Sequence, residues 1–174
     1  MKQMSKYFTQ DEFEHSATAI KYRIENKMNA EQLENATKLF TELIDPLIEK
    51  FAKLLLEKYG ISKTPKGSVT SESGFRCQAL NSHKDIGGSA TSDHLNGGAS
   101  DLKAFDIKYN RDLFNLAMTM PVFDQVILEM PNSQGIPKWV HLGMRKSANR
   151  KMALVAYQVV ENGELRTKYK PFSS

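Results

Sequence analysis

The stretch Ser92-Asp-His-Leu-Asn-Gly-Gly-Ala-Ser-Asp101 contains two candidate ligand residues, and the rest of the chain has to complete the site that they begin. It places His94 and Asp101 seven residues apart, with two glycines and an alanine between them where larger side chains would crowd a backbone approaching an ion. An imidazole nitrogen and a carboxylate oxygen both bind zinc at about 2 Å. The stretch therefore predicts two ligands of a metal site.

A third ligand is needed, because catalytic zinc sites typically use three protein ligands. The best placed of the other histidines is His141, in Lys138-Trp-Val-His-Leu142. Apolar residues alternate in this segment, which predicts a strand that would hold the imidazole rigidly. We therefore expect one zinc ion, bound by His94, Asp101 and His141.

Three motifs together resemble a known family. Ser73-Gly-Phe-Arg76, the Ser92 to Asp101 stretch and Trp139-Val-His141 are similar, in order and spacing, to zinc D-alanyl-D-alanine carboxypeptidases and peptidoglycan endopeptidases. That family shares its fold with the amino-terminal domain of hedgehog proteins. The resemblance covers about residues 65 to 145. The opening segment, Lys6 to Phe13, also resembles the phage-encoded members.

The resemblance implies an activity and a substrate class. The expected substrates are stem peptides of bacterial peptidoglycan that contain D-amino acids, cut either by a DD-carboxypeptidase or by an endolysin-type endopeptidase. Arg76 corresponds to a residue that anchors a substrate carboxylate or polarises the carbonyl, and its planar fork of donors suits both. A structural ion pair is the alternative role for Arg76. Ser92 is expected to bind substrate beside it.

The position of the residue that acts as general acid and base differs from the family pattern. In many members an acid lies two or three residues before the last histidine, but here Trp139 and Lys138 occupy those positions. Our hypothesis is Glu129, at the end of a predicted strand that could lie beside His141. Asp124 and Asp93 are the alternatives.

A non-catalytic function is the competing hypothesis. A zinc-stabilised structural or wall-binding module, for example a virion component, would explain the missing acid. Structural zinc sites usually have four ligands, often cysteines, and this favours the enzyme. Cys77 as a nucleophile lacks a neighbouring His-Asn pattern. His83 is flanked by polar residues, and His15 lies in the predicted helical segment near the start of the chain. Neither is therefore expected to bind metal.

Composition limits the remaining function classes. A chain of 174 residues, 40% of them hydrophobic, is typical of one domain, and we expect residues 1–174 to form a single peptidase domain that acts as a monomer. The net charge of +4 comes from scattered Lys and Arg, so a nucleic-acid partner is not expected. The single cysteine excludes an internal disulfide.

The start of the chain, Met1 to Lys6, lacks the apolar run of a signal peptide, and no segment resembles a membrane span. We therefore expect synthesis in the cytoplasm of a bacterial host. The protein would then act on the cell wall after release by a phage lysis system, or as part of a virion.

The predicted architecture is α+β, with helices packed on a mainly antiparallel sheet that carries the zinc site. A helical part, 1–62, precedes the sheet region, 65–174. Asn29 is the expected N-cap of a helix that Pro46 either kinks or restarts before Tyr59. The other predicted elements are strands at 68–73, 102–105, 123–129 and around Trp139, a helix at 110–118, and a hairpin of 152–160 and 165–169 around Asn162-Gly163.

Overall fold

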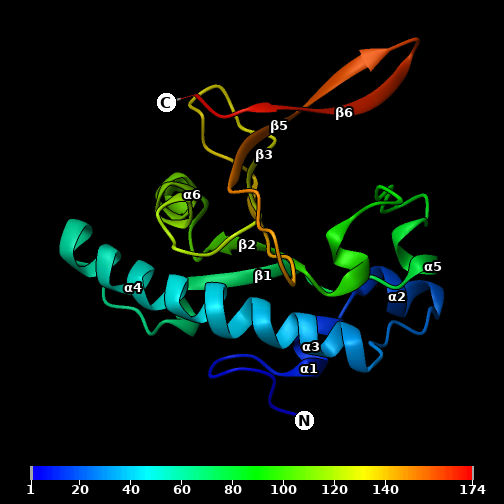
Figure 1. Ribbon diagram of the computed structural model, residues 1–174. Coiled ribbons are helices and arrows are strands. Elements are labelled where there is room, and N and C mark those ends of the chain that lie inside the picture. Colours follow the sequence, from blue (N-terminus) through cyan, green and yellow to red (C-terminus); the bar gives the residue numbers. More distant parts are fainter. Residues whose placement is uncertain (1, 174) are drawn as a thin grey trace.

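Six strands form one sheet in the computed structural model, which describes residues 2–173 (Figure 1). Their order across the sheet is β1-β2-β4-β3-β5-β6. The strands are β1 (Val69–Ser73), β2 (Ala99–Ala104), β3 (Gln125–Glu129), β4 (Trp139–Gly143), β5 (Met152–Glu161) and β6 (Glu164–Pro171). Every neighbouring pair is antiparallel except β3 and β5, which run parallel. The prediction of an α+β fold with a mainly antiparallel sheet is therefore confirmed.

Helices precede the sheet and also lie in the connections between its strands. The α-helices are α1 (Gln10–Glu14), α2 (Ala17–Tyr22), α3 (Ala30–Leu39), α4 (Asp45–Tyr59), α5 (Gln78–Asn81) and α6 (Asn110–Met118). The other helical segments are the π-helix η1 (Phe40–Ile44) and the short 3₁₀ turns η2 (Lys66–Ser68), η3 (Asp93–Asn96) and η4 (Ile107–Tyr109). Within residues 2–173, no helix combines the length and the apolar character needed to cross a membrane.

The longest helical element runs unbroken through Pro46. Asn29 caps α3 with its side chain, as predicted, and α3, η1 and α4 follow one another without a loop (Figure 1). Proline cannot donate a backbone hydrogen bond, and its ring crowds the preceding turn. The widened π turn stands directly before Pro46, with the Asp45 N–H bonded to the Phe40 carbonyl. This wider turn accommodates the proline without a break in the helix.

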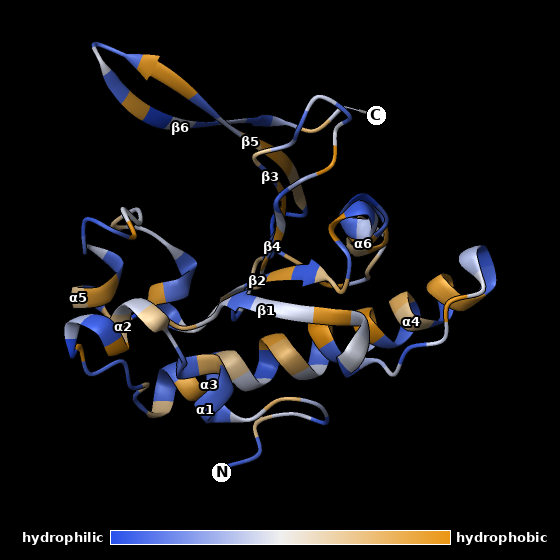
Figure 2. Ribbon diagram, turned by 180° about the vertical axis from the view of Figure 1, so that it is seen from behind, coloured by the Kyte–Doolittle hydropathy of each residue, from blue (hydrophilic) through white to orange (hydrophobic). Residues whose placement is uncertain are grey.

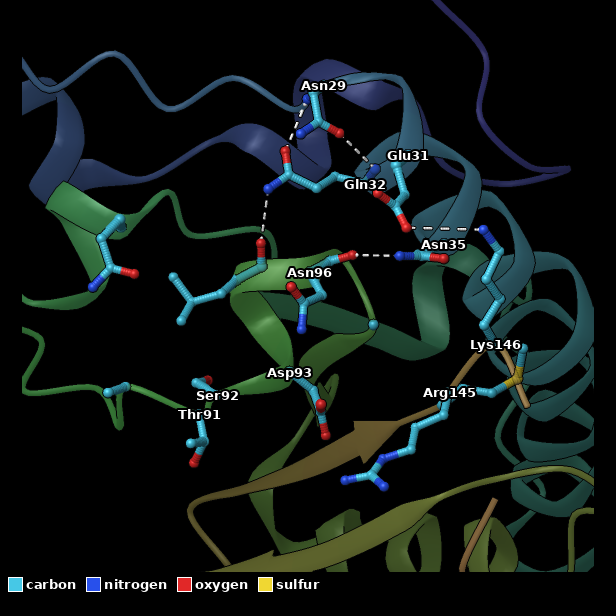
Figure 3. Close-up of a pocket in the computed structure, with 15 residues that line it drawn as sticks. Asn29, Glu31, Gln32, Asn35, Thr91, Ser92, Asp93, Asn96, Arg145 and Lys146 are labelled. Atoms are coloured by element: carbon cyan, nitrogen blue, oxygen red, sulfur yellow. Dashed lines mark hydrogen bonds and ion pairs between the residues drawn. The ribbon is translucent and has the colours of Figure 1, made fainter. Parts of the chain in front are cut away.

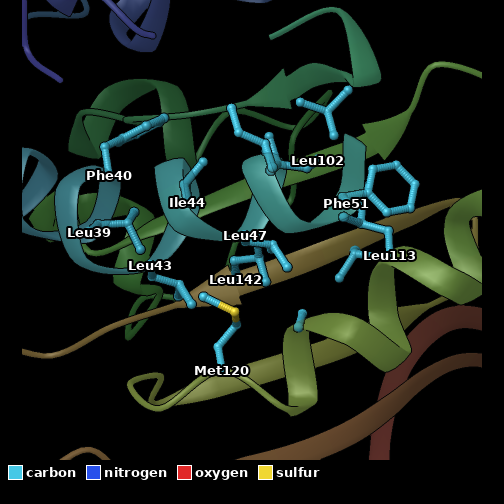
Figure 4. Packing of buried hydrophobic residues seen from close by; sticks show 14 of the residues in the cluster. Leu39, Phe40, Leu43, Ile44, Leu47, Phe51, Leu102, Leu113, Met120 and Leu142 are labelled. Atoms are coloured by element: carbon cyan, nitrogen blue, oxygen red, sulfur yellow. The ribbon is translucent and has the colours of Figure 1, made fainter. Parts of the chain in front are cut away.

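The apolar core lies between this long helix, α6 and one face of the sheet. Leu39, Leu43, Leu47 and Phe51 recur at helical spacing and are fully buried. They pack against Leu102 and Leu142 of the sheet and against Leu113 and Met120 around α6 (Figure 4). Hydrophobic colour follows the same side of α3 and α4 (Figure 2). The opposite face of the sheet carries a smaller apolar cluster of Ile127, Leu154 and Ala156, together with polar side chains.

The tail forms the predicted hairpin and extends well beyond the core. Asn162 and Gly163 have φ values of 53° and 80°, the left-handed conformation that a two-residue turn requires. β5 and β6 pair from Leu154 and Pro171 to Glu161 and Glu164. The hairpin therefore projects from the sheet as an arm (Figure 1).

Asp124 stabilises the start of β3 through an ion pair. Its side chain is fully buried and accepts hydrogen bonds from the backbone and guanidinium of Arg150, with Arg145 Nε 3.3 Å away. Burial alone would raise the pKa of Asp124, but the hydrogen bonds and charges of these arginines hold it below its ordinary value of 3.8. Asp124 is therefore committed to a structural ion pair.

Asp124→Asn should lower the free energy of unfolding by about 1.5–3 kcal/mol at pH 7, the range for hydrogen bonds to charged groups. Because the pKa of Asp124 is lowered in the folded state, this stabilisation is complete above pH 3.8 and is lost as the pH falls through the folded-state value. Urea unfolding at a series of pH values should show parent and variant converging in acid.

The control is Glu57→Gln, which removes the exposed ion pair with Lys53 on α4. It should change stability by less than about 1 kcal/mol at every pH. A gap between Asp124→Asn and the parent that stays constant into strong acid would contradict the ion-pair assignment.

Candidate metal centre

Two adjacent strands bring Asp101 and His141 together. Asp101 in β2 and His141 in β4 are direct cross-strand partners, and His141 Nδ1 lies 3.0 Å from Asp101 Oδ1. Ile127 of β3 is the next partner in this row. Residues directly opposite one another share a face of the sheet. The row therefore lies on the face away from the helices, because Leu102, Val140 and Leu128 point into the core.

His94 reaches the same point from the 3₁₀ turn η3. Its ring is 1% exposed, and Nδ1 lies 2.7 Å from the carbonyl oxygen of Gly74, to which it donates. This hydrogen bond places the lone pair on Nε2, which lies 3.4 Å from Asp101 Oδ2 and has no hydrogen-bond partner within the described structure. A buried ring nitrogen without a partner is costly unless an ion completes it.

The charges of the three residues are strongly coupled. Burial lowers the pKa of His94, which keeps the ring neutral. Burial would raise the pKa of Asp101, but the two histidines hold it well below its usual range. Burial would also lower the pKa of His141, but the hydrogen bond to Asp101 and the nearby negative charges raise it. The Asp101 carboxylate therefore accepts a hydrogen bond from His141, while His94 turns the lone pair of Nε2 towards the same carboxylate.

These residues fit a metal ion by their chemistry. One ligand atom from each of His94, Asp101 and His141 lies within 4.8 Å of the others, and the group is buried. A backbone carbonyl fixes the tautomer of His94, which is the usual arrangement around a metal-bound histidine. Two histidines and one carboxylate form an established ligand set for catalytic zinc. The three predicted ligands are thus brought together.

The glycines of the motif leave room for neighbouring protein backbone. A Cβ on Gly97, where φ is 74°, would clash with the backbone oxygen of Gln32 in α3. A Cβ on Gly98 would lie 2.8 Å from the carbonyl oxygen of Met144. The crowding that excludes side chains here comes from neighbouring protein backbone. Both glycines therefore dock η3 onto the fold.

Glu129 lies on the same face as the metal ligands. It ends β3, two residues after Ile127, and its cross-strand partner is Trp139. Side chains alternate along a strand, so Glu129 shares the face of His141 whereas Asp124 does not. Burial, reinforced by the charge of Asp101, raises the pKa of Glu129 to about 7, although His141 and Arg76 oppose the shift. Glu129 can therefore exist in both protonation states near neutral pH.

Arg76 also faces this group. Burial lowers the pKa of its guanidinium, while Asp101, Tyr169 and Glu129 raise it. Its Nε is buried without a hydrogen-bond partner, and within residues 2–173 no carboxylate forms an ion pair with it. The alternative of a structural ion pair for Arg76 therefore has no support in the structure.

Sequence reasoning missed Asn26, which holds Arg76 in place. Its amide nitrogen donates to the carbonyls of Glu14 and Phe75, and its oxygen accepts from the N–H of Cys77. These contacts fix the backbone on both sides of Arg76. The N–H of Arg76 itself donates a hydrogen bond to the carbonyl of His94. Asn26 stands in an irregular segment remote in sequence, so no local pattern could have identified it.

Ser92 and Asp93 line an open polar cleft. The cleft has a volume of about 880 Å³ and runs between α3, η3 and the chain after β4 (Figure 3). Its walls include Asn29, Gln32, Asn35 and Arg145, but none of the three ligands. Ser92 thus lines a cleft that none of the three ligands lines, and Asp93 points into it (Figure 3).

The other sequence candidates lie outside the group. His15 is exposed, and the ring of His83 packs against that of Tyr22, with the ring centroids 4.2 Å apart. Cys77 is a partly buried free thiol. The structure therefore offers these three residues no part in the metal group.

Comparison with known families agrees with this geometry. The model of the Peptidase M15 family matches residues 6–142, which is most of the chain and includes Arg76, Glu129 and the three ligands. Searches of curated proteins and of solved structures found no match. The match and the buried His-Asp-His group together show that this chain belongs to the Peptidase M15 family of zinc-dependent metallopeptidases.

Proposed function

We propose that this protein is a zinc peptidase that cleaves D-amino-acid-containing stem peptides of bacterial peptidoglycan. The observation that carries the proposal is the convergence of the His94, Asp101 and His141 group with Arg76 and Glu129 on one face of the sheet. A purely structural zinc site would not need a buried guanidinium and a carboxyl group with a pKa of about 7 at its side.

The chain's own groups divide the chemistry between them. Zinc, when bound, supplies Lewis-acid polarisation of a peptide carbonyl and activates water at neutral pH. His94, Asp101 and His141 would hold it. Glu129 accepts the proton of the attacking water and then donates it to the nitrogen of the leaving amine. Arg76 binds an oxygen of the substrate through its planar fork of donors.

The same site could act as a carboxypeptidase or as an endopeptidase. The experiment that separates them incubates purified protein with peptidoglycan, with and without a chelator, and identifies released peptides by mass. Free D-alanine would indicate a DD-carboxypeptidase, and cleaved cross-links would indicate an endolysin-type endopeptidase. Zinc-loaded protein that cleaves no wall fragment would favour the alternative, a zinc-stabilised wall-binding or virion module.

The place of action is part of the proposal. A peptidase of this specificity, made in a bacterial cytoplasm, must be brought to the wall. Release by a phage lysis system or packaging in a virion would provide this, with the protein acting as a monomer. The resemblance of Lys6 to Phe13 to phage-encoded members supports this route.

The first prediction of this function concerns metal content. The purified protein should contain about one zinc ion, and His94→Ala or His141→Ala should remove most of it, because two ligands cannot hold a catalytic zinc firmly. His15→Ala and His83→Ala are matched controls that should keep it. Elemental analysis that found full zinc in both ligand variants would show that the site is assigned wrongly.

Arg76→Lys should lower kcat/KM on wall peptides by about 10- to 100-fold, the range for a lost hydrogen bond between charged groups. Lysine keeps the charge but cannot reproduce the planar fork. The melting temperature should stay within a few degrees of the parent, because Arg76 forms no ion pair in the described structure. A large loss of thermal stability with normal activity per folded molecule would instead assign Arg76 to the fold.

Glu129→Gln should keep zinc and fold but lose at least about 10²-fold in kcat, the usual contribution of a positioned acid or base. Glutamine keeps the size of the side chain but cannot carry the proton. Asp93→Asn is the control and should have a much smaller effect. Asp124→Asn should reduce stability and leave turnover per folded molecule nearly unchanged. Full activity in Glu129→Gln would place the acid elsewhere.

A further inference from the structure

The β5–β6 arm extends the metal-bearing face of the sheet beyond the segment matched by the family model. Glu129 in β3 pairs with Ala156 in β5, and Ala156 pairs with Tyr169 in β6. Direct partners share a face, so Tyr169 lies on the face of Glu129 with one residue between them. The arm projects to the same side of the molecule as the chain that follows α5 (Figure 1).

The residue between them is small. Adjacent strands lie about 4.8 Å apart, which puts the backbone of Tyr169 about 10 Å from that of Glu129. Ala156 is fully buried and presents only a methyl group. Ala156 packs with Ile127 and Leu154, and a tyrosine side chain can extend over its methyl group towards Glu129.

The charged groups of the site act electrostatically on the hydroxyl group of Tyr169. Its burial, with the negative charges of Glu129 and Asp101, raises the pKa of Tyr169 above its ordinary 10.0, and Arg76 opposes this shift. The residue as a whole is still 56% exposed, so the ring remains open to a ligand. A neutral phenol donates a hydrogen bond at physiological pH.

We infer that Tyr169 is a substrate-binding residue, an inference that rests on the proposed peptidase function. Its hydroxyl donates a hydrogen bond to the substrate oxygen that Arg76 also binds, and its ring forms the wall of the site on the side of the arm. Arg76 and Tyr169 come from opposite ends of the sheet region and act on the same ligand group. Tyrosine suits this position because it combines an apolar ring with a polar tip.

The arm contains its own matched control. Tyr157 precedes Gln158 in β5 and pairs with Lys168, on the opposite face from Ala156 and Tyr169. Its ring lies under Lys170, whose Nζ is 5.6 Å from the ring centroid. Tyr157 therefore has the same chemistry on the same hairpin, but it faces away from the metal group.

The test compares Tyr169→Phe, Tyr169→Ala and Tyr157→Phe, all loaded with zinc, on a stem peptide that ends in D-Ala-D-Ala. Loss of one neutral hydrogen bond should lower kcat/KM about 3- to 10-fold in Tyr169→Phe, mainly through a higher KM. Tyr169→Ala should lose more, because the wall is also removed. Tyr157→Phe should match the parent, and zinc content and melting temperature should be unchanged in all three.

A double-mutant cycle tests whether the two residues bind the same group. Tyr169→Phe combined with Arg76→Lys should cost less than the sum of the single effects if they share one substrate oxygen. Normal kinetics in both Tyr169 variants would overturn the inference, and so would an equal loss in Tyr157→Phe.

Binding measurements separate this inference from the proposed function. If the parent cleaves no wall peptide, calorimetric titration of the zinc-loaded parent and of Tyr169→Phe with the same peptide decides the matter. Weaker binding in the variant would support Tyr169 while the catalytic proposal fails. Equal binding would overturn Tyr169 alone, and a parent that neither cleaves nor binds would overturn both.

Discussion

The register between β2 and β4 is the constraint on which the site depends. Pairing Asp101 with His141 places both side chains on one face and sends Leu102 and Val140 to the other. A slip of one residue would bury the ionisable groups among Leu43, Leu47 and their neighbours and would expose the apolar set. Both consequences are unfavourable. The hydrophobic core under α3 and α4 therefore specifies the metal centre without touching it.

The opposite face carries polar and charged groups whose burial is unfavourable, and the free energy gained by the apolar core offsets this cost. Asp101 is buried between two imidazoles, and Glu129 has a pKa of about 7. Among residues 2–173, His94 Nε2 and Arg76 Nε have no hydrogen-bond partner. Each feature opposes folding when the site holds neither metal nor substrate. Groups of this kind gather where a protein binds or transforms a ligand. The main apolar core thus lies on one face of the sheet, and the reactive groups gather on the other.

The sequence was sufficient for features that depend on local spacing. His94 and Asp101 share one short motif, His141 stands in an alternating strand, and Asn162-Gly163 is a turn signal, so all of these could be placed in advance. Glu129 required an assumption about which strands are neighbours. Asn26 was missed because its contact with Cys77 spans 51 residues and follows no periodicity. The contact that excludes a side chain at Gly97 was also missed, because the backbone of Gln32 comes from α3.

Local sequence patterns also could not predict the parallel pairing of β3 with β5. This pairing affects the chemistry of the site. After β4 the chain crosses over so that β5 covers the free edge of β3, and the N–H of Met130 bonds to the carbonyl of Ala156. Without β5, Glu129 would end an edge strand and its carboxyl group would be open to water. Since burial is the main reason for its raised pKa, the hairpin helps to set the proton affinity of Glu129. The tail of the chain thus contributes to the site through Ala156 as well as through the proposed contact of Tyr169.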